Sequence, residues 1–316
     1  MRVFSKPIEL LPLFRERIWG RESLEPLFPD QASNERIGEV WFTFEENRTS
    51  EGKNLRTVLE ESPKILGDAA DPQHPGICPI LLKLLFTTER LSVQVHPDDD
   101  YAQQHHQSLG KTEAWYVLDS RPPGELAVGF RETLTPERLR EAALSGEIEH
   151  LLAWRKAKTG DVIFTPAGAV HAIGAGLTIC EIQENSDITY RLYDYGRPRE
   201  LHLEHGSKVS QLGPYQHQAS IVQLAPGRDE LAACRYFRIE RLRPEFGFRI
   251  ESLPCYAIAL CVKGEGQLPG AVSFRAGQAW LLPAGTDLTV DGPGSEWIVT
   301  YSAERAAAGI SLGAQD

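Results

Sequence analysis

The sequence has no excess of positive charge and no long apolar segment. Its 316 residues include 44 acidic and 33 basic side chains, which give a formal net charge of −11. A chain of this charge offers no general surface for nucleic acid or for an anionic membrane. No segment approaches the ~18 to 20 consecutive apolar residues of a membrane helix, and residues 1–20 contain no apolar stretch of signal-peptide length. We therefore expect a cytoplasmic protein with no nucleic-acid or membrane partner.

Cysteine is scarce as well, and its spacing argues against one common class of metal site. The five cysteines are scattered along the chain, and no two of them are spaced as CxxC. An odd, dispersed set suits a reducing compartment and argues against a metal held by sulfur. Cys180 and Cys261 lie in apolar runs. We predict that both simply fill core space.

The chain is rich instead in short runs of β-branched and aromatic residues separated by Gly, Pro and Asp. Examples are EVWFTFE, DVIFTPAG, YAIALCVKG and EWIVTYS. Such runs predict antiparallel sheets that form barrels or sandwiches. A helix is expected around residues 54–60. A helical insert is expected at about residues 132–153, where Thr135 can cap, Pro136 suits the first helical position and Gly146 divides the segment.

An internal repeat sets the number of domains. Residues 160–168 read GDVIFTPAG, and residues 277–285 read GQAWLLPAG, so one strand-and-turn unit occurs twice. We predict two related β domains. The first covers about residues 75–210 and carries the helical insert, the second covers about residues 230–305, and residues 1–74 pack on them.

Only the first copy of the repeat is followed by a residue that binds metals. His171 stands three residues beyond the first copy, whereas Leu288 stands at the same step beyond the second. Residues 230–305 contain no histidine at all. The chemistry is therefore predicted in the first domain. The second is interpreted as a degenerate, metal-free copy that covers apolar surface of the first.

Polar side chains gather on one face of a predicted strand at residues 90–97. Because side chains alternate along a strand, Ser92, Gln94 and His96 are expected on one face and the apolar residues between them on the other. Three inward polar groups cost desolvation free energy unless they bind something. The same alternation places Lys111 and Glu113 together on the next polar strand.

Four residues of these segments form a candidate metal site. They are Gln94, His96, Glu113 and His171. Two imidazoles, one carboxylate and one amide oxygen fit Zn²⁺ with a position open for substrate, although iron fits the same ligand types. A single histidine or buried glutamate is more often an ordinary hydrogen-bonding group. The convergence of all four on successive strands is what favours a metal.

Two arginines follow six residues apart. Arg191 and Arg197 stand downstream of Glu181, and the planar guanidinium group suits bidentate binding of phosphate oxygens. The alternative is ordinary ion pairing with nearby acidic residues such as Asp194. This alternative is stronger for Arg197 than for Arg191, whose neighbours are apolar and aromatic.

Several segments together resemble the type I mannose-6-phosphate isomerases, most closely their short bacterial form. They read RIWG (17–20), QVHP (94–97), KTE (111–113), PAGAVHAIGAG (166–176) and EIQENSDITYRLYDYGR (181–197). The resemblance covers nearly the whole chain. It implies a mainly β fold of two cupin (jelly-roll) β-barrels with a small helical insert, the second barrel degenerate. It also implies reversible conversion of mannose 6-phosphate and fructose 6-phosphate by a metal-assisted enediol mechanism.

The resemblance also implies roles for individual residues. The zinc ligands, for one Zn²⁺ per chain, would be Gln94, His96, Glu113 and His171. Ser92, Lys111 and Arg197 would bind the sugar phosphate, and Arg191 with Lys111 would stabilise developing negative charge. The large helical domain of the longer family members is missing here, and only the insert near residues 132–153 stands in its place.

The proton-transfer group is a separate hypothesis. Isomerisation needs a proton removed from carbon 2 and returned at carbon 1. Glu181 is one candidate base. A metal-bound water is another, and so is Lys111 if burial lowers its pKa.

Other functions fit parts of the same pattern. An iron-dependent cupin dioxygenase would use similar ligands, although Gln94 and the arginines speak against it. A non-catalytic sugar-phosphate-binding protein would keep the pocket without the turnover. An isomerase for another sugar phosphate, such as glucose 6-phosphate, would differ only in pocket contacts. A monomer and a small homo-oligomer are both compatible with the sequence.

Overall fold

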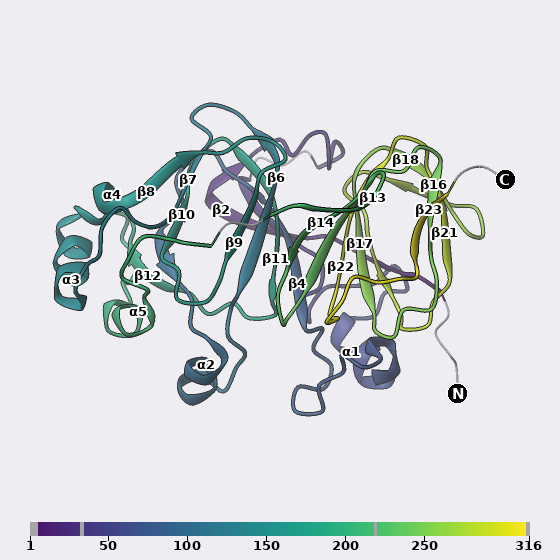
Figure 1. The fold of residues 1–316 in the computed structure, drawn as a ribbon, viewed down its shortest axis with the longest axis horizontal. Coiled ribbons are helices and arrows are strands. Elements are labelled where there is room, and N and C mark those ends of the chain that lie inside the picture. The colour runs from purple at the N-terminus through teal and green to yellow at the C-terminus, as the bar shows by residue number, and fades with distance from the viewer. Residues whose placement is uncertain (1–5, 32–34, 218–219, 314–316) are drawn as a thin grey trace.

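The computed structural model describes residues 6–31, 35–217 and 220–313. Strands dominate it, and they form four antiparallel sheets that follow one another along the long axis of the molecule (Figure 1). Two sheets make up what we call the first lobe, and the other two make up the second lobe. Among the described residues, no helix is long and apolar enough to cross a membrane.

The first lobe pairs a six-stranded with a five-stranded sheet. The six-stranded sheet has the order β2 (Leu13–Arg21), β3 (Ile37–Trp41), β4 (Ile80–Phe86), β11 (Leu177–Glu184), β6 (Glu113–Ser120) and β9 (Val162–Thr165). The five-stranded sheet has the order β12 (Tyr190–Tyr193), β5 (Val93–Val95), β10 (His171–Ile173), β7 (Glu125–Phe130) and β8 (Leu152–Lys156).

The second lobe has a seven-stranded and a five-stranded sheet. The larger has the order β1 (Ile8–Leu10), β20 (Ala279–Leu282), β17 (Ala257–Lys263), β22 (Glu296–Tyr301), β15 (Arg238–Leu242), β14 (Arg228–Ala233) and β13 (Val222–Ala225). The smaller has the order β19 (Val272–Arg275), β18 (Glu265–Leu268), β21 (Leu288–Asp291), β16 (Gly247–Ile250) and β23 (Ile310–Gly313). The N-terminal region therefore does more than pack on the lobes, because β1 joins the second lobe while β2 and β3 join the first.

Alternation of side chains explains why the sheets stack. On β11, Cys180 and Ile182 belong to the large apolar cluster shared with the second lobe, which also contains Ile258. Ile179, on the opposite face of β11, belongs to a separate cluster inside the first lobe, together with Val128 of the five-stranded sheet. Both faces of the six-stranded sheet are thus buried. Any polar side chain on its inner face must find a partner there.

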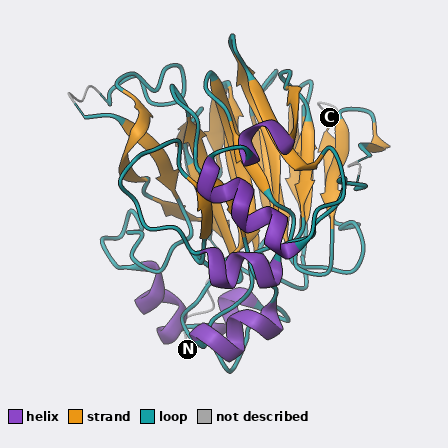
Figure 2. Cartoon of the chain, turned by 90° about the vertical axis from the view of Figure 1, so that its left-hand side faces the viewer, coloured by secondary structure: helices purple, strands orange, loops and turns teal. Residues whose placement is uncertain are grey.

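Five helices accompany the sheets in the described part of the chain (Figure 2). They are α1 (Leu55–Glu61), α2 (Asp99–His106), α3 (Pro136–Ser145), α4 (Ile148–Leu151) and α5 (Leu203–Val209), with a 3-10 turn at Pro63–Leu66. The predicted helical insert is confirmed as α3 and α4. The Thr135 side chain caps α3 by accepting from Arg138 N, Pro136 opens the helix, and Gly146 ends it with φ of 82°. Apolar residues of α3 and α4 pack on the outer face of the five-stranded sheet.

The predicted internal repeat is confirmed by backbone conformation. Gly160 and Gly277 have φ of 91° and 90°, and Gly168 and Gly285 have φ of 85° and 75°. The two copies therefore make the same turns at the same steps, in conformations that favour glycine. They end differently, because the first leads into β10 with His171 and the second into β21, which begins at Leu288.

Candidate metal centre and its surroundings

The inner faces of the two sheets of the first lobe bring the predicted metal ligands together. Glu113 lies at the start of β6 and His171 at the start of β10. Gln94, on β5, is the direct cross-strand neighbour of His171. His96 follows β5 directly, and its side chain is 2% exposed. Strand pairing within the five-stranded sheet places His171 beside Gln94, and the stacking of the two sheets brings Glu113 to them.

The three residues His96, Glu113 and His171 have the geometry of a metal site. Their candidate ligand atoms all lie within 4.8 Å of one another. His171 Nε2 is 3.3 Å from Glu113 Oε1, and His96 Nε2 is 3.6 Å from Glu113 Oε2. Although all three side chains are buried, His96 Nε2 and Glu113 Oε1 have no hydrogen-bond partner, and Glu113 Oε2 contacts the Lys111 ammonium at 3.2 Å. Each such buried atom costs about 1 to 3 kcal/mol unless something binds it, so these residues fit a bound cation.

A hydrogen bond at Nδ1 of each imidazole orients the ring for metal binding through Nε2. Nδ1 of His96 lies 2.8 Å from Ile188 O, and Nδ1 of His171 lies 2.9 Å from Ala169 O. A carbonyl oxygen only accepts, so Nδ1 carries the proton and the lone pair of Nε2 faces Glu113. Burial lowers the pKa of both rings, that of His171 to about 4. Both are therefore neutral, as a metal ligand must be.

Gln94 has the expected position but a different amide orientation. Its Nε2 lies 3.1 Å from His171 Nε2 and donates to that lone pair, while Ser92 Oγ donates to Gln94 Oε1 at 3.4 Å. Ligation through oxygen would need a half-turn of the amide group. Ser92 is buried beside the site, on the face of the segment that was predicted.

Lys111 lies next to the cluster as a cation. Its Nζ is 3.2 Å from Glu113 Oε2, and its side chain is almost fully buried. Burial alone would lower the pKa of Lys111, but the carboxylates of Glu113, Glu181 and Asp187 outweigh it and the pKa is raised. The prediction that burial lowers this pKa is therefore wrong for the described structure, because it took no account of the surrounding acidic groups.

A second group of buried polar side chains, which was not recognised in the sequence, lies near Lys111 and is centred on Lys83. Lys83 projects from β4 on the same inner face, with Nζ 3.7 Å from Glu181 Oε1 and 3.8 Å from Asp187 Oδ1. It also lies over the Trp41 ring, 4.3 Å from the centroid. Burial, with help from the Glu113 carboxylate, raises the pKa of Glu181 to about 7. One signal was present in the sequence, since a lysine interrupts the otherwise apolar run ILLKLLF.

The two candidate phosphate arginines differ in their surroundings. Arg191 pairs directly with Gln94 across β12 and β5, so it shares the inner face, and its buried Nε has no partner. Arg197 is engaged elsewhere, with NH2 3.0 Å from Asp194 Oδ1 and 2.7 Å from the carbonyl oxygen of Arg90. The ion pair with Asp194, which was the alternative to a phosphate role for Arg197, is thus present.

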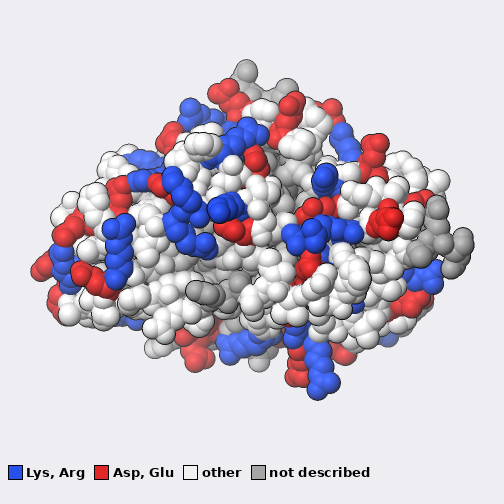
Figure 3. Space-filling model, turned by 45° about the horizontal axis from the view of Figure 1, so that its top comes forward, with Lys and Arg blue, Asp and Glu red and all other residues white. Residues whose placement is uncertain are grey.

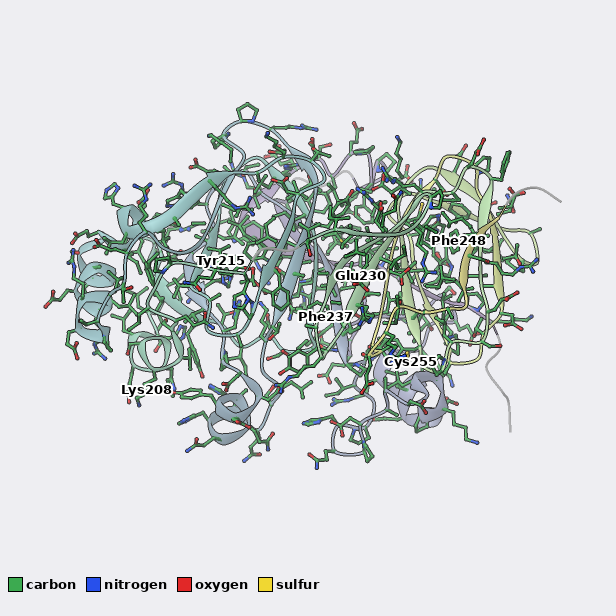
Figure 4. The ribbon with its side chains drawn as sticks, in the orientation of Figure 1. Lys208, Tyr215, Glu230, Phe237, Phe248 and Cys255 are labelled. Atoms are coloured by element: carbon green, nitrogen blue, oxygen red, sulfur yellow. The ribbon has the colours of Figure 1, made fainter. Side chains whose placement is uncertain are left out.

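Neither the surface charge nor the cavity described below points to a second functional site. Figure 3 shows acidic and basic side chains interspersed over one face of the molecule, with no broad surface of one sign. A cavity of about 450 Å³ opens elsewhere on the first lobe, beside Phe130, Phe164 and Tyr215. None of the candidate site residues lines it. Figure 4 labels Tyr215 on the first lobe.

Comparison with known proteins agrees with the fold and with the resemblance seen in the sequence. The family model "Phosphomannose isomerase type I, catalytic domain" matches residues 8–135. This match includes three of the four candidate ligands and ends before His171. Longer similarity comes from whole proteins. The chain is 33% identical over 302 residues to mannose-6-phosphate isomerase ManA of Bacillus subtilis, covering 89% of this chain and 94% of that protein.

Two further comparisons extend this similarity. The chain is 29% identical over 298 residues to the mannose-6-phosphate isomerase of Streptococcus mutans, covering 88% of this chain and 93% of that protein. Its fold superposes on the crystal structure of the mannose 6-phosphate isomerase from Bacillus subtilis with a TM-score of 0.85. That superposition covers 93% of this chain and 99% of the other, at 29% identity.

Proposed function

The chain belongs to the type I phosphomannose isomerase family, and from this premise we propose that it interconverts mannose 6-phosphate and fructose 6-phosphate. The observation that carries the proposal is the buried cluster of His96, Glu113 and His171 with unpaired ligand atoms. A buried ion pair, Lys83 with Glu181, lies on the same inner face. Each relative described above also carries the name of an isomerase, which favours this function over a dioxygenase or a non-catalytic binding protein.

The cofactor proposed for the cluster is one Zn²⁺ per chain. His96, Glu113 and His171 would hold it, with Gln94 as a fourth ligand after its amide turns. This donor set lacks thiolate and keeps a net positive charge when a divalent cation is bound, which suits an oxygen-rich anionic substrate. A zinc ion there would act as a Lewis acid toward the sugar oxygens without changing redox state.

The remaining steps fall to side chains of the chain itself. The reaction moves one proton from carbon 2 to carbon 1 and another from the oxygen of carbon 2 to that of carbon 1. Glu181 is the proposed group for the carbon-bound proton, because a carboxyl group with a pKa of about 7 can both accept and release a proton near neutrality. The ammonium group of Lys83 holds that carboxylate in place. Lys111 and Arg191 stabilise the negative charge that develops on the sugar oxygens.

The decisive experiment measures fructose 6-phosphate formation from mannose 6-phosphate by the purified protein. The protein is assayed as isolated, after chelation, and after zinc is restored. We expect activity to disappear with the metal and to return with it. Absence of turnover in all three states would overturn the proposed reaction, and full activity after complete metal removal would overturn the role of the metal.

The proposed phosphate contact of Arg197 can be separated from its structural one. Arg197 and Arg199 both bind Asp194, but Arg199 is not proposed to contact the substrate. Replacing Arg197 with Met should raise KM for mannose 6-phosphate by about tenfold or more, since a hydrogen bond to a charged group contributes ~1.5 to 3 kcal/mol. Arg199→Met is the matched control and should leave KM nearly unchanged. Equal effects of the two variants would show that Arg197 acts only through Asp194.

A further inference from the structure

The short segment that carries Lys111 and Glu113 is held from both sides by acidic side chains. Gly110 N donates to Asp99 Oδ1 on α2 at 3.0 Å. Thr112 N donates to Glu184 Oε2 at the end of β11 at 2.7 Å, and Glu184 N donates back to Thr112 O at 3.1 Å. Lys111 and Glu113 flank Thr112 in the chain. The place of both side chains is therefore tied to these two carboxyl groups.

The two carboxyl groups are also hydrogen-bonded to each other. Two carboxylates in contact repel, so this bond needs one proton between them. Burial and the neighbouring Asp99 raise the pKa of Glu184 to about 8, whereas hydrogen bonds from Tyr236 and Glu184 outweigh burial and lower the pKa of Asp99. At neutral pH, Glu184 is therefore the protonated partner and Asp99 the anion.

The second lobe supplies the other partners of Asp99. Tyr236 donates its hydroxyl to Asp99 Oδ2 at 2.6 Å, and Arg235 NH2 lies 2.9 Å from the same oxygen. Both residues lie in the turn between β14 and β15. Figure 4 labels the next residue, Phe237, in the region where the lobes meet. Cys234, the remaining titratable group of this turn near Glu184, is a thiol whose pKa burial raises, so it stays neutral.

We propose that Glu184 and Asp99 share one proton and, with Tyr236 and Arg235, form a positioning network through which the second lobe sets the place of Lys111 and Glu113. The proposal rests on the proposed function, because the positioned residues are those assigned to the metal and the sugar oxygens. It gives the lobe without metal ligands a part in the active site of the first lobe. Glu184, Asp99 and Tyr236 are positioning residues, since none of them is assigned a contact with the substrate.

The replacement Glu184→Gln tests the shared proton. An amide can donate to Asp99 and accept from Thr112 N at every pH, whereas Glu184 must keep its proton to do both. The folded protein holds that proton up to about pH 8, while the unfolded chain releases it near the ordinary value of 4.5. Stability of the wild type therefore falls with rising pH between these two values, and the variant lacks this fall.

We expect the difference in Tm between Glu184→Gln and the wild type, both measured without metal, to shift in favour of the variant as the pH rises from 5 to 8.5. A difference that stays constant over this range would overturn the shared proton. On the zinc-loaded protein, the kcat of the wild type should decline above about pH 8, and the kcat of Glu184→Gln should not. Identical pH profiles of kcat would overturn the link to the active site.

The contribution of the second lobe is tested by Tyr236→Phe, with Tyr301→Phe as the matched control. Tyr301 also donates to a buried carboxylate, that of Glu240, but only within the second lobe. Tyr236→Phe should speed zinc release to a chelator by about tenfold, the low end of the 10- to 100-fold loss of metal affinity seen when groups bonded to metal ligands are replaced, because Tyr236 acts one step further away. Tyr301→Phe should leave that rate unchanged. Unchanged release in both would overturn the positioning role. Because Tm and zinc release need no substrate, they stand even if mannose 6-phosphate is not turned over.

Discussion

Replacing Glu113 with Gln is expected to remove the bound metal and the isomerase activity together, and to lower the free energy of unfolding of the metal-free protein by about 3 to 5 kcal/mol. Glu113 is fully buried and is the only carboxylate in the cluster with His96 and His171. It is also the closest anion to the Lys111 ammonium, at 3.2 Å. An amide would offer the metal no charge and would leave Lys111 without its nearest counter-ion.

The second lobe provides a matched control for this variant. Glu240 is also fully buried and forms a two-point ion pair with Arg228, at 2.6 and 2.9 Å. Glu240→Gln should cost a similar free energy of unfolding but should leave the metal content unchanged. The measurements are the metal-to-protein ratio by elemental analysis and the free energy of unfolding from denaturant titration. A Glu113→Gln protein that retains one metal per chain would contradict the proposed site.

The predicted parts of the fold and site are those that depend on local alternation. Side chains on adjacent steps of a strand face opposite ways, so Gln94 and His96 could be placed together, and the turn glycines identified the repeat. The same alternation puts Glu113 and Glu181 on the inner face of their sheet. These inferences need only neighbours in the sequence, which is why the structure agrees with them.

The parts that could not be predicted depend on pairing between distant strands. Lys83 lies in an apolar run, and its importance appears only because β4 lies beside β11, which brings it to Glu181. The raised pKa of Lys111 has this origin only in part, since Glu113 lies two residues away in the sequence, whereas the carboxylates of Glu181 and Asp187 reach Lys111 from other segments. The contact of Tyr236 with Asp99 crosses between the lobes. The residue pattern within a single segment cannot show that side chains of two distant segments are in contact.

Lys83 and Glu181 should behave as one catalytic unit. Each of the variants Lys83→Met and Glu181→Gln is expected to lower kcat by about 10²- to 10⁴-fold, the range of general acid–base catalysis. Both variants lose the same proton transfer. Glu181→Gln removes the carboxylate, and Lys83→Met removes the buried ammonium group 3.7 Å from it. Neither residue belongs to the ligand cluster. The metal content of both variants should therefore match that of the wild type.

The double variant distinguishes a unit from two separate roles. If the pair acts together, Lys83→Met with Glu181→Gln should lose no more than about tenfold beyond the worse single variant, because the second replacement removes an interaction that is already broken. A loss equal to the product of the two single losses would mean that the residues act independently. Lys156→Met is the control, since this lysine is mostly exposed and pairs with Glu125 at 3.6 Å. Near-normal kcat for Glu181→Gln with metal bound would remove Glu181 from proton transfer and leave Lys83 to be tested as the base.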